Sequence, residues 1–205
     1  MDTWHSYRVR LNLDCDGQPR WWLDMLLIDT LVRDALMSSP TPQIWRIHRR
    51  YADDKAGHEF AFQCYATSVV HDGIAAIVRE HAALRVLQDA ETLREYVETE
   101  EGAGVEATSD REWSVPLQAA WPYYIQGVSR MLLELVEHIR ESPRPDCTEA
   151  DFQELESYYS ALSGLVLRTW REEGSHAILH HVNALFGYEP VIAQPRWVGG
   201  SLVVF

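Results

Sequence analysis

The chain has 205 residues, of which 46% are hydrophobic and eight are tryptophan, so it is long enough to bury a core in one large domain or two small ones. Its formal net charge of −13 disfavours nucleic acid and anionic membrane surfaces as partners. No apolar run approaches the roughly 20 residues that span a bilayer, and the N-terminus lacks the pattern of a signal peptide. We therefore expect a globular cytoplasmic protein.

The three cysteines, Cys15, Cys64 and Cys147, are an odd number and show no CxxC spacing. This pattern argues against both a disulfide framework and a zinc knuckle. Reduced thiols are expected, with Cys64 packed in a strand. The sequence indicates no cofactor.

The N-terminal half carries strand and helix patterns in the order β-α-β-β-α. Apolar and polar residues alternate over residues 7–13, as in a half-buried strand, and residues 21–37 are predicted to form a largely buried helix. Ile44–Tyr51 and His58–Ala66 form a predicted hairpin, and helical spacing from residue 69 continues as a second short helix to residue 97. This order predicts a ferredoxin-like half.

The C-terminal half is predicted to be nearly all helical. Residues 98–112 are acidic and Gly-rich and are expected to form a connector. A helix is expected over residues 117–140, with Pro122 in its first turn, and another begins at a capping box of Thr148 and Asp151. Residues 201–205 are strand-like and are expected to add an edge to the sheet.

The predicted fold is α+β, with a ferredoxin-like half packed on a C-terminal helical bundle. The expected boundaries are residues 1–98 for the first half, 99–116 for the connector and 117–205 for the helical half, all integrated in one domain. The interface between the halves is a natural place for a pocket. Exposed aromatic residues and the strand-like tail make a homodimer a further expectation.

Three histidines and an asparagine lie in an apolar helical run near the C-terminus. His176 and His180 are four residues apart and share a helix face, so they are a candidate metal pair that needs a third ligand from another helix. His181 is a candidate general acid or base because imidazole titrates near neutral pH, and Asn183 lies two residues further on. The alternative for His181 is a histidine hydrogen-bonded in the core.

One basic cluster stands out in the acidic chain. Arg46, His48 and Arg50 follow a period of two, so they are expected to share one face of a strand. A groove for a peptide or an anion and a solvated sheet face are the two interpretations. Arg50 with Asp53 is a candidate clamp for an anionic group, and the alternative for Asp53 is capping of the hairpin turn.

Two short segments of the chain resemble the thiopeptide-type bacteriocin biosynthesis family, which includes the glutamate-elimination domain of lantibiotic dehydratases. They are Trp45 … Arg50-Tyr51-Ala52-Asp53 … His58-Glu59-Phe60-Ala61-Phe62 and Leu179-His180-His181-Val182-Asn183-Ala184-Leu185-Phe186-Gly187. The resemblance implies His181, Arg50 and Asn183 as catalytic residues, with Arg46, His48, Asp53 and His58 as substrate-binding residues. Phe60, Phe62 and Ala184 stand where the family has arginines.

Three functions follow as hypotheses. The first is a tailoring or accessory protein for ribosomally made peptide natural products, an elimination-type lyase whose partner is a peptide or another biosynthetic protein. The second is a binding module without chemistry, in which Phe60 and Phe62 mark an apolar pocket. The third is a helical metal-binding protein that uses His176 and His180.

Overall fold

The computed structural model describes the chain except for residues 38–39, 52–56, 188–195, 199–200 and 204–205. The chain divides into two compact units, Met1–Val166 and Leu167–Phe205. The first unit holds a four-strand antiparallel sheet and most of the helices. Among the described residues, none of the helices combines the length and the apolar character that crossing a bilayer requires.

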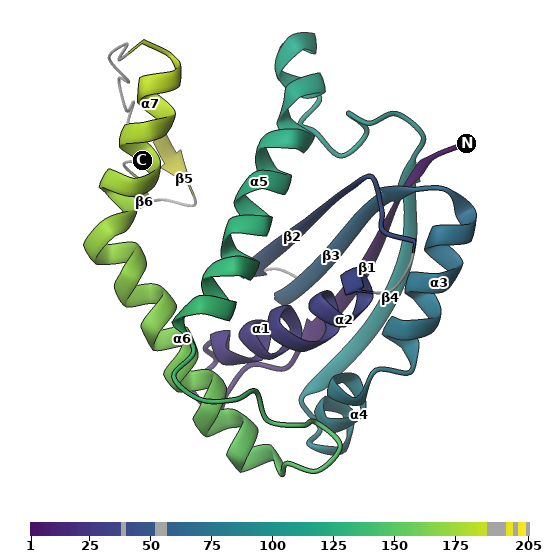
Figure 1. The fold of residues 1–205 in the computed structure, drawn as a ribbon, viewed down its shortest axis with the longest axis vertical. Helices are drawn as coiled ribbons and strands as arrows, with labels where there is room; N and C mark the ends of the chain where they lie inside the picture. Colours follow the sequence, from purple (N-terminus) through teal and green to yellow (C-terminus); the bar gives the residue numbers. More distant parts are fainter. Residues whose placement is uncertain (38–39, 52–56, 188–195, 199–200, 204–205) are drawn as a thin grey trace. The chain divides into compact units, whose positions relative to one another are not determined.

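The sheet of the first unit has the strand order β2-β3-β1-β4 (Figure 1). Its strands are β1 (Thr3–Leu11), β2 (Ile44–Tyr51), β3 (His58–Ala66) and β4 (Leu93–Gly102). The helical segments are α1 (Trp21–Leu27), the π-helix η1 (Ile28–Val32), α2 (Arg33–Met37), α3 (Ser68–Arg79), α4 (Ala82–Asp89), α5 (Val115–Ile139) and α6 (Phe152–Gly174). These elements confirm the predicted α+β class and both strands of the predicted hairpin.

One face of the sheet is apolar and carries the core. Alternate residues of β1 and β3, among them Tyr7, Val9, Phe60, Phe62 and Cys64, are at most 1% exposed. The continuous helical run of residues 21–37 crosses this face, as Figure 1 shows, and confirms the predicted buried helix. Burial raises the pKa of the Cys64 thiol well above its ordinary value, so this cysteine is an inert core residue, as expected.

Three aspartates, Asp24, Asp29 and Asp34, follow one another at intervals of five residues along the buried helical run. The first two are fully buried, and a buried carboxylate persists only when it is paired. Their partners are Arg49 and His58 for the first, Arg33, Arg140 and Tyr159 for the second, and His81 and Arg144 for the third. The carboxylates therefore link this helical run to β2 and β3, to α5 and α6, and to α4.

Pro122 lies inside α5 rather than in its first turn, which corrects the prediction. Proline has no N–H, so the carbonyl of Gln118, four residues earlier, loses its helical donor. The Ser109 hydroxyl donates to that carbonyl at 2.9 Å. The segment before α5 therefore supplies the hydrogen bond that Pro122 removes.

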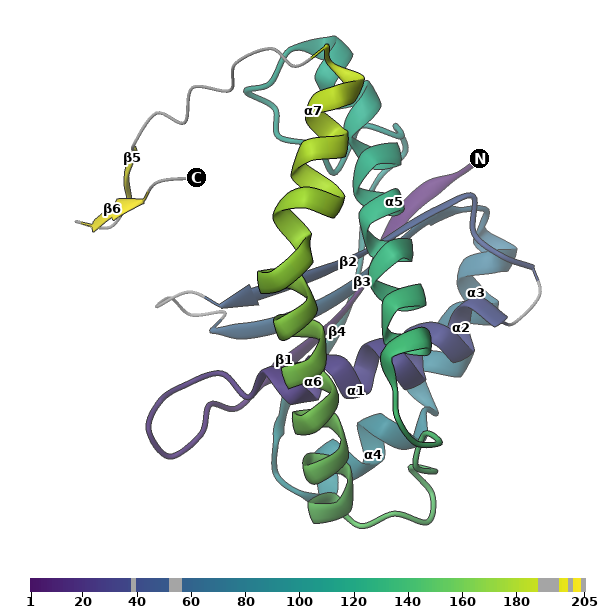
Figure 2. The same ribbon diagram turned by 60° about the vertical axis from the view of Figure 1, so that its left-hand side comes forward.

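Helix α5 also crosses β2, an edge strand of the sheet, and packs against it (Figure 1, Figure 2). The Ile47 N–H donates to the Ser129 hydroxyl oxygen at 3.0 Å. This contact satisfies a backbone donor that would otherwise point out from the edge of the sheet.

Strand β4 corrects the prediction for residues 93–102, where a helix to residue 97 and then a connector were expected. The strand is rich in glutamate, a composition that does not favour strands. It forms because its backbone pairs with β1 from Leu93 to Gly102. Residues 99–102 therefore belong to the sheet.

Two further predictions are wrong in detail. Helix α6 begins at Phe152, where the Asp151 carboxylate accepts from the N–H of Glu154 at 2.8 Å, whereas the Thr148 hydroxyl donates to Asp146. Strand β6 (Ser201–Val203) pairs with β5 (Arg196–Val198) and not with an edge of the four-strand sheet. The first outcome depends on which side chain caps the helix, and the second depends on which strands pair.

The second unit contains the end of α6, the π-helix η2 (Ser175–His180) and α7 (His181–Leu185). Helical backbone continues through Gly174, where a break or restart was expected, and becomes π-helical at the next residue. Gly187 has a φ of 77°, a left-handed conformation that suits glycine after a helix and confirms the predicted cap.

Candidate functional site

The second face of the sheet is polar, and the strand register arranges its side chains in three rows. The rows across β2, β3, β1 and β4 are Arg50-Glu59-Arg10-Glu95, His48-Ala61-Arg8-Val97 and Arg46-Gln63-Ser6-Thr99. Residues directly opposite one another in a sheet project to the same face. The predicted shared face of Arg46, His48 and Arg50 is therefore confirmed.

A cavity of about 350 Å³ lies over this polar face and is called the groove below. Its lining includes four arginines, two glutamates, His48, Gln63 and Thr108. Ala61 lies in the middle row between His48 and Arg8, and its single methyl group leaves room where larger side chains surround it. The groove thus exists because the central position of the face carries a small residue.

Carboxylates neutralise two of the groove arginines. Arg10 Nε lies 3.0 Å from Glu59, and Arg10 also pairs with Glu95. Arg8 pairs with Glu101 and lies 3.8 Å from the largely buried Glu59. These pairs leave little net charge on the β1 side of the groove.

Arg46, on β2, has a different environment. Its Nε donates to the Gln63 side-chain oxygen at 2.6 Å and its Nη2 to the Thr108 carbonyl at 3.2 Å, and its guanidinium lies 5.8 Å from the centre of the Trp4 ring. Burial lowers the pKa of Arg46, and the charge of Glu101 opposes that shift. Arginine remains protonated in proteins. Because its hydrogen-bond partners among the described residues are neutral, its positive charge is not cancelled by a direct ion pair.

His48 lies beside Arg46 in the neighbouring row. The surrounding protein atoms and then the positive charge of Arg46 lower the pKa of His48 below its ordinary value of about 6.5. Glu59 opposes this shift, whereas Arg50 and Arg8 add to it. The imidazole is therefore neutral at pH 7 and can accept a proton in the groove.

His58 and the two phenylalanines of β3 do not line the groove, which corrects two predictions. His58 is fully buried on the core face, with Nε2 2.9 Å from the Asp24 carboxylate, because its place in the strand alternation turns it toward the helices. Phe60 and Phe62 are also fully buried on that face, so they do not form an exposed apolar pocket. The predicted position of Asp53 lies outside the described residues.

The histidine-bearing segment belongs to the second unit, whereas Arg50 belongs to the first, so the predicted catalytic set of His181, Arg50 and Asn183 stays a prediction. His181 is exposed, which contradicts the alternative of a core histidine, and its Nδ1 donates to the His176 carbonyl at 3.2 Å. The rings of His176 and His180 are stacked, with centroids 5.1 Å apart. No group of three or more metal-ligating side chains is found among the described residues.

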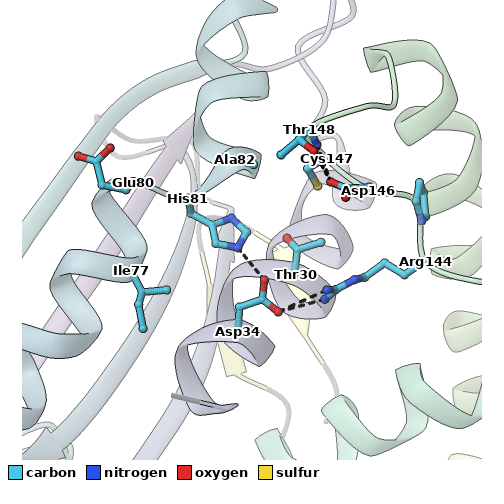
Figure 3. Close-up of a pocket in the computed structure, with 11 residues that line it drawn as sticks. Thr30, Asp34, Ile77, Glu80, His81, Ala82, Arg144, Asp146, Cys147 and Thr148 are labelled. Atoms are coloured by element: carbon cyan, nitrogen blue, oxygen red, sulfur yellow. Dashed lines mark hydrogen bonds and ion pairs between the residues drawn. The ribbon is translucent and has the colours of Figure 1, made fainter. Parts of the chain in front are cut away.

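A second cavity, of about 440 Å³, is shown in Figure 3. Asp34 lies between His81, whose Nε2 is 3.2 Å away, and Arg144, at 3.3 Å. The His81 Nδ1 accepts from the N–H of Ala83 at 3.2 Å, so Nε2 carries the proton that is donated to Asp34. Burial raises the pKa of the Cys147 thiol to about 11, so that thiol is protonated at neutral pH. These polar groups join α2, α4 and the segment before α6.

Sequence reasoning missed the groove residues Arg8, Arg10 and Thr108. The alternation of arginines with apolar residues in β1 placed Arg8 and Arg10 on a polar face, but their position beside Arg46 depends on strand order. Thr108 follows β4 in a segment with no periodicity, so no sequence signal pointed to it. Comparisons with protein-family models, with curated proteins and with solved structures found no match for this chain.

Proposed function

We propose that this protein binds a carboxylate-bearing segment of a peptide in the groove, as a cytoplasmic accessory or tailoring protein of ribosomally made peptide natural products. The observation that carries the proposal is Arg46, a half-buried cation whose hydrogen-bond partners among the described residues are neutral. A hydrogen bond to a charged partner contributes about 1.5–3 kcal/mol, and a half-buried guanidinium is less screened than an exposed one.

The size of the groove supports a small occupant. Ligand cavities are commonly about 300–1,000 Å³, and the groove volume of about 350 Å³ is near the lower limit. A cavity of this size suits one or two peptide side chains better than a folded partner surface.

The biosynthetic context is supported by the two segments that resemble the thiopeptide-type bacteriocin biosynthesis family. We also propose that the chain consists of a ferredoxin-like half packed on a helical bundle. It is supported by the order β1-α1-β2-β3-α3-β4 and by the antiparallel strand order β2-β3-β1-β4.

The proposal is tested by titrating isotope-labelled protein with the acetylated and amidated peptide Ala-Ala-Glu-Ala-Ala and following the Arg46 Nε–H signal by NMR at low ionic strength. The glutamate peptide is expected to shift this signal, and the matched glutamine peptide is not. Arg46→Gln and the groove-filling Ala61→Leu are expected to weaken binding by about tenfold or more. Arg130→Gln, on the exposed surface of α5, is the control and retains binding. Wild-type affinity in both groove variants would refute the proposal.

Elimination chemistry is a second candidate function, favoured by the neutral His48 beside the cationic Arg46. In such a reaction the imidazole takes the Cα proton of a glutamylated serine, the Cβ–O bond breaks, and glutamate leaves as a carboxylate. Arg46 stabilises the negative charge that develops. Mass spectrometry of a peptide containing glutamylated serine tests this candidate: the expected product has lost glutamate and contains dehydroalanine, and His48→Gln is expected to form none. A peptide that remains intact with the wild-type protein would exclude this reaction for that substrate.

A further inference from the structure

Thr108 lines the groove, and its hydroxyl oxygen is buried without a hydrogen-bond partner among the described residues. Folded proteins pair nearly all of their buried polar atoms, so an unpaired hydroxyl in a cavity lining points to a group that binds there. The carbonyl of the same residue accepts from Arg46 Nη2 at 3.2 Å. The unpaired hydroxyl therefore belongs to a residue that directly contacts the Arg46 guanidinium.

The segment that carries Thr108 is attached to the protein at several points. The Trp4 Nε1–H donates to the Val105 carbonyl at 2.8 Å, and the Tyr65 hydroxyl donates to the Ala103 carbonyl at 3.1 Å. On the other side, the Ser109 hydroxyl donates to Gln118. The backbone at Thr108 is thus held in place before any ligand arrives, which lowers the entropic cost of binding.

Arg46 and Thr108 together offer two donors to one small anion. The Arg46 Nη1 makes no hydrogen bond to a described residue. Rotation about χ1 of Thr108 moves the hydroxyl into another staggered position, from which it can face a group at the guanidinium. Glu59 and Glu101 line the same groove, and His48 adds no charge while it is neutral. This balance suits a single negative charge, because Glu59 and Glu101 are paired with Arg8 and Arg10 whereas Arg46 has only neutral hydrogen-bond partners among the described residues.

We propose that Arg46 and Thr108 form a subsite that selects the carboxylate of a glutamate or aspartate side chain over a phosphate. The inference rests on the proposed peptide-binding function and names the group that the groove recognises. The Thr108 hydroxyl and the Arg46 guanidinium each donate to the bound carboxylate.

The test compares three acetylated peptides on the wild-type protein: the amidated Ala-Ala-Glu-Ala-Ala, its phosphoserine counterpart, and an all-alanine peptide with a free C-terminus. The glutamate peptide is expected to bind at least about tenfold more tightly than either of the others, the difference that one hydrogen bond to a charged group produces. Equal or tighter binding of the phosphoserine peptide would overturn the selectivity. Equal or tighter binding of the all-alanine peptide would assign the subsite to a C-terminal carboxylate and overturn the side-chain assignment.

Thr108→Val keeps the shape of the side chain and the backbone carbonyl but removes the hydroxyl, and Thr108→Ser keeps the hydroxyl. We expect about tenfold weaker binding of the glutamate peptide to Thr108→Val and near wild-type binding to Thr108→Ser. Because the valine also removes an unpaired buried hydroxyl, its melting temperature is expected to be at least that of the wild type, whereas a structural role would lower it. Wild-type affinity in Thr108→Val, together with lost affinity in Arg46→Gln, would refute the subsite alone. Wild-type affinity in both Arg46→Gln and Ala61→Leu would instead refute the proposed function.

Discussion

Ser109→Ala tests how α5 accommodates a proline in its interior. The substitution removes the hydroxyl that donates to the Gln118 carbonyl at 2.9 Å and leaves this carbonyl without the donor that replaces the missing N–H of Pro122. Ser109 is only 9% exposed, so water replaces the lost donor poorly. The expected loss in the free energy of unfolding is about 1–2 kcal/mol, the cost of an unpaired buried acceptor.

A double-mutant cycle with Pro122→Ala separates this cause from a simple loss of packing. Alanine at position 122 restores an N–H donor to the Gln118 carbonyl, so in that background Ser109→Ala is expected to cost about 1 kcal/mol less. Urea unfolding followed by circular dichroism and tryptophan fluorescence measures both costs. Ser160→Ala, on the exposed surface of α6, is the control and is expected to change stability by less than about 0.5 kcal/mol. The same cost for Ser109→Ala in both backgrounds would refute the reasoning.

Three further predictions concern the charged residues. Burial raises the pKa of Asp34, but His81 and Arg144 lower it, and the net shift is downward. The stabilisation that ionised Asp34 contributes is therefore present above about pH 3.9 and is lost as the pH falls through the lowered pKa. Asp34→Asn is expected to reduce the change in the free energy of unfolding between about pH 6 and pH 2, as measured by urea unfolding. Because the pKa of His48 is lowered, its protonation below about pH 6.5 adds positive charge to the groove. The affinity for the glutamate peptide is expected to rise in this acidic range. The same pH profile of affinity in His48→Gln as in the wild type would contradict this. Asp29→Ala leaves Arg33 without its fully buried partner. The expected loss in the free energy of unfolding is about 3 kcal/mol in the same assay, and a loss below about 1 kcal/mol would show that the buried pair is dispensable.

The sequence by itself determined the features that depend on neighbours along the chain. The alternation in residues 44–51 and 58–66 determined both hairpin strands, and it placed Arg46, His48 and Arg50 on one face. The apolar composition of residues 21–37 predicted their burial. A period of two or of 3.6 residues is a local property, and local properties can be read from one chain.

Only the tertiary structure decided which segments of the chain lie next to one another. The charged residues of β4 form a strand because β1 offers its backbone as a pairing partner, and the strand order brings Arg8 and Arg10 beside the face of Arg46. The buried partner of His58 is Asp24, which lies 34 residues away in the sequence. Thr108 lies in the groove because its carbonyl accepts a hydrogen bond from Arg46, 62 residues earlier in the sequence. Strand order, register and such long-range contacts depend on which distant segments pair, and periodicity within a segment carries no information about its partner.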